Sequence, residues 1–186
     1  MNNDDTGGGA GPSMIALDLD GTLLDYSPEG ERPAVNWAVI RDLAARGVRK
    51  VAIVTNQGGL PWFVMDVLHK DGRPYPSPAQ FLNRLAVAVD ALSRYGIKVD
   101  DVRVSCYHPR ADEAAIQRAA TEVRAGIQRA IIAGNWRVYT TASARKPNPL
   151  MLRSVGASEY WGDSPEDQQA AQAAGIPFML VRRFLG

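Results

Sequence analysis

Residues 14–24 read MIALDLDGTLL, an apolar run that carries two acidic residues. The run Met14–Leu19 is interrupted only by Asp18, a pattern that indicates a parallel strand buried on both faces. Asp18 and Asp20 fall where this strand ends, and Gly21 follows them in a tight turn. Open α/β sheets bind their ligands at the carboxyl ends of their strands. This segment therefore predicts both a central strand and a site at its end.

Strand-like apolar runs alternate with amphipathic helical patterns along the rest of the chain. The strand-like runs end in Gly, Asp, Asn or Thr, which is typical of βαβ units and predicts an α/β fold with a parallel sheet. Further strands are expected at Lys50–Thr55, Val102–Tyr107, Glu159–Trp161 and Pro177–Val181. Helices are expected at Pro33–Ala45, Pro78–Tyr95, Ala111–Ala133, Pro149–Val155 and Pro165–Ala174.

The bulk composition fits a single domain. With 186 residues, of which 46% are hydrophobic and 22% charged, the chain can bury one substantial core. We expect a flexible, glycine-rich tail over residues 1–12 and one domain over residues 13–186. The single Cys106 excludes an intramolecular disulfide and suits a reducing compartment, so a cytoplasmic protein is expected. We expect neither a signal peptide nor a membrane span.

Basic residues gather between Arg103 and Arg153, although the formal net charge is only +1. Such a segment could favour an anionic substrate. Arginines at helical spacing are also typical of a solvated helix face, so both interpretations stay open.

Residues 58–78 (GGLPWFVMDVLHKDGRPYPSP) are rich in glycine, proline and aromatic residues and follow the second predicted strand. Loops at this edge of a parallel sheet build the ligand crevice. The segment is therefore a possible lid, with a short helix around Trp62–Leu68. A surface excursion without a catalytic role is the alternative.

The acidic residues at the predicted strand ends indicate phosphoryl transfer. Of Asp18 and Asp20, one could stay ionised and attack phosphorus, while the other could protonate the leaving oxygen and later activate water. A carboxylate repels a dianionic phosphate, so such a site needs a cation. Asp163 and Asp167 add hard oxygen ligands that suit Mg²⁺.

Polar residues at the end of the second strand complete this constellation. Thr55 and Asn56 offer a hydroxyl, an amide and backbone N–H groups to phosphate oxygens, and Lys146 offers a positive charge to the transferring phosphoryl group. Each residue alone has an ordinary structural explanation; Asp163, for example, could cap a helix. Their order along the chain and their places at strand ends favour one shared site.

These motifs resemble those of the haloacid dehalogenase superfamily of phosphohydrolases. DLDGTL resembles the first motif of that superfamily, IVTN the second, Lys146 in ARKPNP the third and GDSPED the fourth, and the match spans residues 15–178. The resemblance implies a three-layer Rossmannoid fold with a minimal cap domain or none. It also implies an Mg²⁺-dependent phosphatase that works through an aspartyl phosphate.

The resemblance assigns a role to each of these residues. It implies that Asp18 is the nucleophile, Asp20 the general acid and base, Thr55 a phosphate-binding residue and Lys146 the charge stabiliser. The Mg²⁺ ligands that it implies are Asp18, the Asp20 backbone carbonyl and Asp163, with Asp167 as a direct or indirect partner.

The combination of TNQGG, RKPNP and a short chain is similar to subfamily III of the superfamily. This group contains histidinol-phosphate and heptose-bisphosphate phosphatases and the phosphatase domain of polynucleotide 3′-phosphatases. The likeness adds Asn56, Gln57 and Arg145 as substrate-binding residues. The zinc loop common in the sugar-phosphate branch needs two further cysteines after a Cys-x-His, and only Cys106 and His108 are present here. We therefore expect no zinc and a buried, structural Cys106.

The substrate stays open between two classes. A polynucleotide 3′-phosphate end would suit the basic helix Ala111–Ala133, with Trp62, Phe63 and Tyr75 as stacking groups. A small sugar or amino-alcohol phosphate would suit the same site with these aromatic residues packing the lid. A phosphotransferase or mutase and a non-catalytic phosphate-binding protein are the alternative functions. The sequence predicts no oligomeric state.

Overall fold

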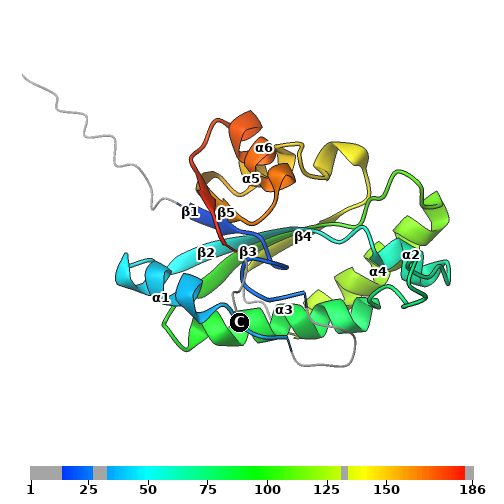
Figure 1. Cartoon of the computed structure of the whole chain (residues 1–186), viewed down its shortest axis with the longest axis horizontal. Coiled ribbons are helices and arrows are strands. Elements are labelled where there is room, and N and C mark those ends of the chain that lie inside the picture. Colours follow the sequence, from blue (N-terminus) through cyan, green and yellow to red (C-terminus); the bar gives the residue numbers. More distant parts are fainter. Residues whose placement is uncertain (1–13, 27–32, 131–133, 183–186) are drawn as a thin grey trace, which may run out of the picture.

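The computed structural model describes residues 14–26, 33–130 and 134–182, so the predicted tail lies outside the described residues. Within them, parallel strands form one sheet in the order β4-β3-β2-β1-β5-β6 (Figure 1). The α/β class that the sequence predicts is confirmed. The strands are β1 (Met14–Leu17), β2 (Lys50–Asn56), β3 (Lys98–Ser105), β4 (Asn135–Tyr139), β5 (Ala157–Gly162) and β6 (Phe178–Leu180).

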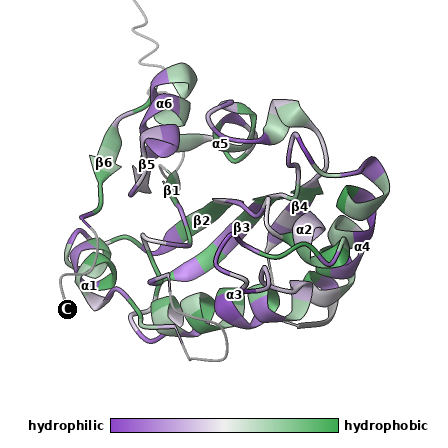
Figure 2. Cartoon of the chain, turned by 45° about the vertical axis from the view of Figure 1, so that its right-hand side comes forward, coloured by the Kyte–Doolittle hydropathy of each residue, from purple (hydrophilic) through white to green (hydrophobic). Residues whose placement is uncertain are grey.

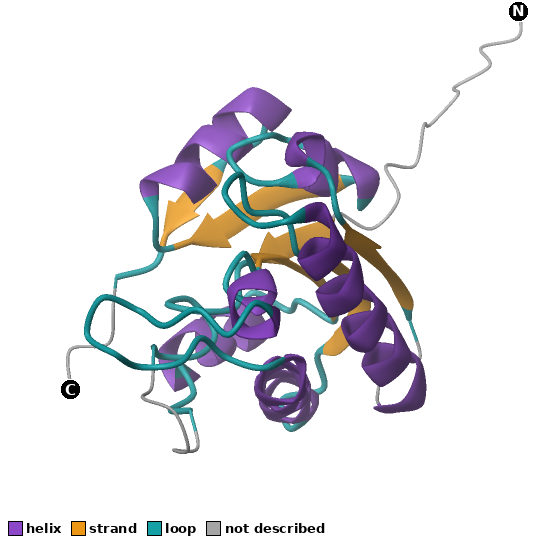
Figure 3. Ribbon diagram, turned by 90° about the vertical axis from the view of Figure 1, so that its right-hand side faces the viewer, coloured by secondary structure: helices purple, strands orange, loops and turns teal. Residues whose placement is uncertain are grey.

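Helices cover both faces of the sheet, which gives three layers (Figures 1 and 3). One face carries α1 (Trp37–Ala45), α3 (Pro78–Ser93) and α4 (Glu113–Ala130). The other face carries α5 (Leu150–Ser154) and α6 (Pro165–Ala174). The short α2 (Leu60–Val64) packs beside α4. None of the helices in the described ranges combines the length and the apolar character that a membrane span requires.

The central strands alternate between two cores, because successive side chains of a strand point to opposite faces. Ile15 and Leu17 of β1 belong to the larger core beneath α1, α3 and α4. Ala16 lies between them and belongs to the smaller core beneath α5 and α6, together with Ala52 and Tyr160. Hydrophobic and hydrophilic residues accordingly alternate along α3 and α4, as expected for helices that cover a sheet (Figure 2).

The order of the strands places the site. The chain runs from β1 outward through β2 and β3 to the edge strand β4, and then returns to β5 on the other side of β1. This reversal creates a crevice beyond the carboxyl ends of β1, β2 and β5, where α/β folds bind ligands. Asp18, Thr55 and Asp163 stand at these three strand ends.

The sequence analysis missed β4 and misplaced the start of β3. Residues Asn135–Tyr139 carry only one buried side chain, Val138, because the strand is at the sheet edge, so no apolar run indicates it. β3 starts at Lys98 rather than at Val102. The first part of β3 contains charged residues and so shows no apolar run, although it pairs with β2 from Lys50 onward.

Helix starts also differ from the predictions. α1 begins at Trp37 rather than Pro33, because Val35 makes an antiparallel bridge to Leu24 and the Asn36 side chain caps the helix. The helix expected around Trp62–Leu68 is α2, which starts earlier and has a proline in its first turn. The helix expected at Ala111–Ala133 is α4, and residues 131–133 lie outside the described residues.

Candidate active site

Asp18 is buried at the carboxyl end of β1. Its backbone N–H donates to the carbonyl of Trp161 on β5 (2.9 Å), which fixes its position between the two strands. Its side-chain Oδ1 accepts a hydrogen bond from Lys146 Nζ (2.7 Å). Burial raises the pKa of Asp18 to about 7; Lys146 opposes this shift and the nearby Asp167 adds to it.

Lys146 lies at the centre of a buried polar network. Its ammonium group contacts Asp18, Asp167 Oδ1 (2.6 Å), the Tyr160 hydroxyl (2.8 Å) and the Val54 carbonyl (3.3 Å). The residue is only 3% exposed. Burial opposes the charged ammonium, but the two carboxylates outweigh it and raise the pKa of Lys146. A fixed positive charge therefore stands beside the predicted nucleophile.

Asp167 connects this network to the start of α6. Its Oδ2 accepts from the Ser164 hydroxyl (2.6 Å) and the Ser164 backbone N–H (3.2 Å), which completes a capping box. Its Oδ1 accepts from Lys146 and from the Tyr160 hydroxyl (2.8 Å). Burial would raise the pKa of Asp167, but the Lys146 charge outweighs burial and holds that pKa below its ordinary value. The residue that caps the helix thus also positions Lys146.

Thr55 and Asn56 end β2 next to Asp18. Thr55 is buried and its hydroxyl accepts a hydrogen bond from the Gln57 amide (3.1 Å). Both polar atoms of the Asn56 side chain bind the backbone of Lys146, one to its N–H (3.0 Å) and one to its carbonyl (3.2 Å). The Asn56 side chain thereby holds the Lys146 segment against β2, a task that the sequence analysis did not foresee.

Asp20 is held from two sides. Its Oδ2 accepts from the Gln57 amide (2.8 Å), and its Oδ1 accepts from Arg84 Nε (3.0 Å) and Nη2 (2.6 Å). Arg84 lies on α3, 64 positions away along the chain, and was not among the predicted residues. The sequence does offer a signal for Arg84, because this arginine lies beside the apolar stripe formed by Phe81 and Leu85. A charge at such a position is costly unless it has a partner.

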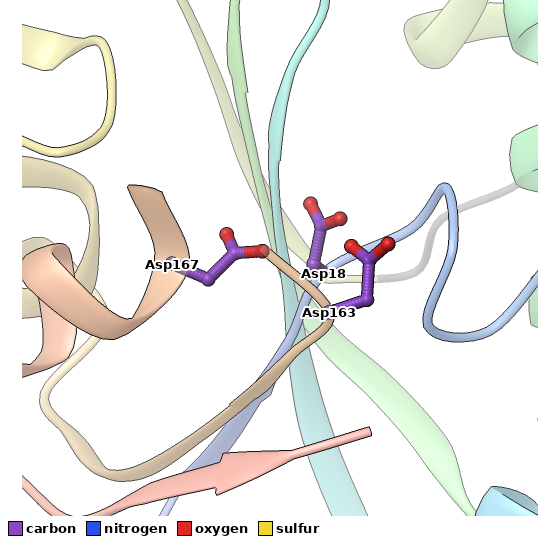
Figure 4. A group of neighbouring side chains, drawn as sticks. All are labelled: Asp18, Asp163 and Asp167. Carbon is purple, nitrogen blue, oxygen red and sulfur yellow. The ribbon is translucent and has the colours of Figure 1, made fainter. Parts of the chain in front are cut away.

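The acidic cluster fits a divalent metal ion. Asp18, Asp163 and Asp167 each offer a carboxylate oxygen, and these oxygens lie within 4.8 Å of one another (Figure 4). Space is kept open for Asp163 by Gly21, because a Cβ at that position would lie 2.2 Å from Asp163 Oδ2. Gly21 also has φ +85°, a conformation that favours glycine. Carboxylate oxygens are the ligands that Mg²⁺ prefers, so the donor set suits this ion.

Two neighbouring cavities meet at Asp20 and Tyr26. The first, of about 200 Å³, is the site cavity. The predicted residues that line it are Asp18, Asp20, Thr55, Asn56, Arg145, Lys146, Asp163 and Asp167. The second, of about 360 Å³, is lined by Gln57 and by part of the 58–78 segment, the possible lid, including Tyr75. The structure therefore brings the predicted residues together and places residues of the 58–78 segment beside them.

Tyrosines that the sequence analysis did not single out contribute to the site. Tyr160 on β5 is buried, and its hydroxyl contacts Lys146 and Asp167. A tyrosine within a predicted buried strand usually has a hydrogen-bond partner for its hydroxyl, and this was the one indication of its role in the sequence. Tyr26 is 61% exposed, lines both cavities and places its hydroxyl 3.5 Å from Asp163 Oδ2.

Cys106 and His108 lie beyond β3. Cys106 is buried, as expected, and burial raises the pKa of its thiol to about 12, which makes it a poor nucleophile. The His108 ring packs edge-on against Trp62, with ring centroids 4.9 Å apart. The Arg145 guanidinium near His108 donates to the Tyr107 carbonyl (3.2 Å). The expected absence of zinc stays a prediction.

Mg²⁺ is expected to stabilise the protein through Asp163. At 100 times its Kd, a bound ion adds about 2.7 kcal/mol, a rise of roughly 5–10 °C in Tm for a chain of this size. EDTA should reverse the rise, and Asp163→Asn should lose most of it in a calorimetric melt. The control Asp90→Asn removes a surface carboxylate that pairs with Arg94 and should keep the rise. An equal rise in the Asp163 variant would contradict the metal assignment.

The metal effect should also depend on pH. The pKa of Asp18 lies near 7 in the folded chain without metal, against an ordinary value of 3.8. The folded state therefore binds more protons than the unfolded state between about pH 4 and pH 7, and this contribution to stability is lost as the pH rises. Mg²⁺ would replace that proton, so the rise in Tm should be larger at pH 8 than at pH 5. A rise that is larger at pH 5 would contradict Asp18 as a ligand.

Comparison with known proteins gives one informative likeness. The chain is 27% identical over 191 residues to a phosphoglycolate phosphatase from Rhodobacter capsulatus. The aligned region covers 91% of this chain and 83% of that protein. No family model matches the sequence, and no solved structure matches it. The likeness and the parallel sheet support the haloacid dehalogenase superfamily. They do not distinguish its subfamilies.

Proposed function

We propose that the chain is an Mg²⁺-dependent phosphatase that hydrolyses phosphate monoesters through an aspartyl phosphate on Asp18. The observation that carries the proposal is the convergence of Asp18, Lys146 and Asp163 beside one cavity. A buried carboxylate next to a fixed ammonium and a metal-binding acid suits attack on a phosphate dianion, because both cations offset the repulsion. The 27% identical relative, which is named as a phosphatase, supports this class of reaction.

In the first step, Asp18 attacks phosphorus and the bond to the leaving oxygen breaks while Asp20 donates a proton to that oxygen. Lys146 favours the ionised form of Asp18 and stabilises the charge on the phosphoryl oxygens. The Thr55 hydroxyl and the Asn56 backbone N–H are suited to bind these oxygens. Bound Mg²⁺ would neutralise charge on the phosphate.

In the second step, water attacks the phosphorus of the aspartyl phosphate. Asp20 accepts the proton of this water, and the bond between phosphorus and the Asp18 oxygen breaks, which releases phosphate and restores both residues. Gln57 and Arg84 hold the Asp20 carboxylate between the two cavities as the proton acceptor that this second step needs. To act as the acid of the first step, one Asp20 oxygen exchanges a hydrogen-bond donor for a proton. Asp18, the Asp20 carbonyl and Asp163 would hold the metal, and Asp167 would position Lys146.

A small phosphorylated metabolite is the substrate class that we favour. The cavity beyond Asp20, of about 360 Å³, falls in the range of small-molecule sites. Two arginines of the basic helix are engaged within the protein, since Arg118 pairs with Glu122 and Arg124 donates to the Val138 carbonyl. This leaves less of the helix charge for a polynucleotide. The TNQGG and RKPNP segments still favour subfamily III, which includes both kinds of enzyme.

A substrate screen tests the proposal. Phosphorylated sugars, amino alcohols and carboxylic acids are compared with a 3′-phosphorylated oligonucleotide, each with Mg²⁺ and with EDTA. We expect Mg²⁺-dependent release of one phosphate per substrate consumed, at a rate that changes little with salt for a small substrate. Preference for the oligonucleotide, with a rate that falls steeply as salt rises, would show that the substrate is a polynucleotide end and not a metabolite. Substrate loss without free phosphate would indicate a phosphotransferase, and no turnover of any ester would contradict the proposal.

A further inference from the structure

The cavity beyond Asp20 has the position of a leaving-group subsite. Its lining shares Asp20 and Tyr26 with the site cavity, so a phosphate ester bound at Asp18 would extend into it past the predicted general acid. One wall is aromatic, because the rings of His69 and Tyr75 stack with their centroids 3.6 Å apart. Such a wall offers apolar contact to a small leaving group.

Arg84 gives this subsite its polar character. The guanidinium uses Nε and Nη2 for the Asp20 carboxylate, and Nη2 also donates to the Asp25 carbonyl. Within the described residues, Nη1 has no hydrogen-bond acceptor, although the side chain is only 16% exposed. Nη1 is therefore available to a ligand, while the bonds of Nε and Nη2 to Asp20 hold the guanidinium in place. A ligand in this cavity could provide the missing acceptor.

The charges around the cavity favour an anionic acceptor. Among the described residues that line it, Asp20 is the one acid, and both of its oxygens already accept hydrogen bonds. Arg73, which pairs with Asp71, adds a second guanidinium to the lining. Guanidinium groups bind carboxylates through charge-assisted hydrogen bonds, which are stronger than those to a neutral hydroxyl.

We propose that this cavity binds the leaving group of the substrate and that Arg84 selects leaving groups that carry a carboxylate. The inference rests on the proposed phosphatase function and names the substrate class of that site. Arg84 is then both the residue that positions Asp20 and a specificity residue. These two tasks have different signatures, because loss of positioning affects every ester whereas loss of selection affects only the carboxylated ones.

The test compares 3-phosphoglycerate with glycerol 3-phosphate, two esters that differ in a carboxylate against a hydroxymethyl group. Each is used as a competitor of p-nitrophenyl phosphate hydrolysis, so that its inhibition constant is obtained whether or not it is turned over. We expect 3-phosphoglycerate to bind at least about tenfold more tightly than glycerol 3-phosphate, the effect of one hydrogen bond between charged groups.

Arg84→Gln should reduce this ratio to about one, and Arg84→Lys should keep part of it. The control Arg94→Gln removes an exposed arginine of the same helix and should leave the ratio unchanged. Because both variants lose one positive charge, this control separates the role of Arg84 from general attraction to the extra charge of 3-phosphoglycerate. A wild-type ratio near one, or a ratio that survives in Arg84→Gln, would overturn the proposal. A fall in turnover with an unchanged ratio would show that Arg84 only positions Asp20.

Calorimetric titration of the Asp18→Asn chain with both compounds and Mg²⁺ measures the same ratio without turnover. This separates the two proposals. Absence of p-nitrophenyl phosphate hydrolysis by the wild type would contradict the phosphatase, whereas equal affinities in the titration would contradict the carboxylate subsite alone.

Discussion

Asp18→Asn is expected to reduce turnover of any substrate by about 10⁴-fold or more, the scale seen when a covalent nucleophile is removed. The amide is nearly the same size as the carboxylate but is a very weak nucleophile. It also removes a negative charge next to Asp167, so the fold should tolerate it. The measurement is Mg²⁺-dependent hydrolysis of p-nitrophenyl phosphate, with circular dichroism to verify folding.

The control for this variant is Asp90→Asn, which removes a carboxylate exposed on α3. Its turnover should equal that of the wild type. Retained turnover in a folded Asp18→Asn chain would show that the reaction does not use this carboxylate as its nucleophile.

Lys146→Met is expected to lower both stability and activity strongly. The substitution leaves Asp18 and Asp167 buried together without the ammonium that both contact. Removal of one partner from a buried ion pair typically costs about 3–5 kcal/mol of unfolding free energy. Urea denaturation in EDTA measures this loss, and EDTA prevents a metal from compensating for the missing charge.

The loss should grow with pH. Without Lys146, the two buried carboxylates favour their protonated forms, so the folded state binds more protons than the unfolded one and its stability falls as the pH rises. The destabilisation should therefore be larger at pH 8 than at pH 5. The control Lys50→Met removes an exposed lysine whose Nζ lies 3.5 Å from Asp100 Oδ2. It should lower the free energy of unfolding by less than about 1 kcal/mol. A similar small cost in Lys146→Met would contradict the buried network.

The convergence of the candidate site residues could be predicted from the sequence to the extent that it follows from strand ends. Asp18, Thr55 and Asp163 each follow an apolar run, and the ends of neighbouring parallel strands must meet at one edge of the sheet. Lys146 was identified by its motif, and the structure places its ammonium 2.7 Å from Asp18. Local patterns and a resemblance were sufficient here because each residue lies close to a strand end or in a recognisable segment.

The remaining contacts depend on how distant elements pack. The Arg84 guanidinium reaches Asp20 only because α3 packs on the face of the sheet, against β3 and α4, and no local pattern specifies that contact. From the sequence, Tyr160 is simply one residue of a predicted strand. In the structure its ring lies in the smaller core and its hydroxyl accepts a hydrogen bond from Lys146. The edge strand β4 has too few buried residues to produce an apolar run. In each case the deciding interaction is tertiary.

Direct detection of the phosphorylated residue tests the central proposal most sharply. The protein is mixed with substrate and Mg²⁺, quenched in acid and reduced with borohydride, which converts an aspartyl phosphate to homoserine. Mass spectrometry of the peptide that contains residue 18 should then find homoserine at that position, dependent on substrate and absent from Asp18→Asn. An unmodified Asp18 during active turnover, or homoserine at another residue, would contradict the account.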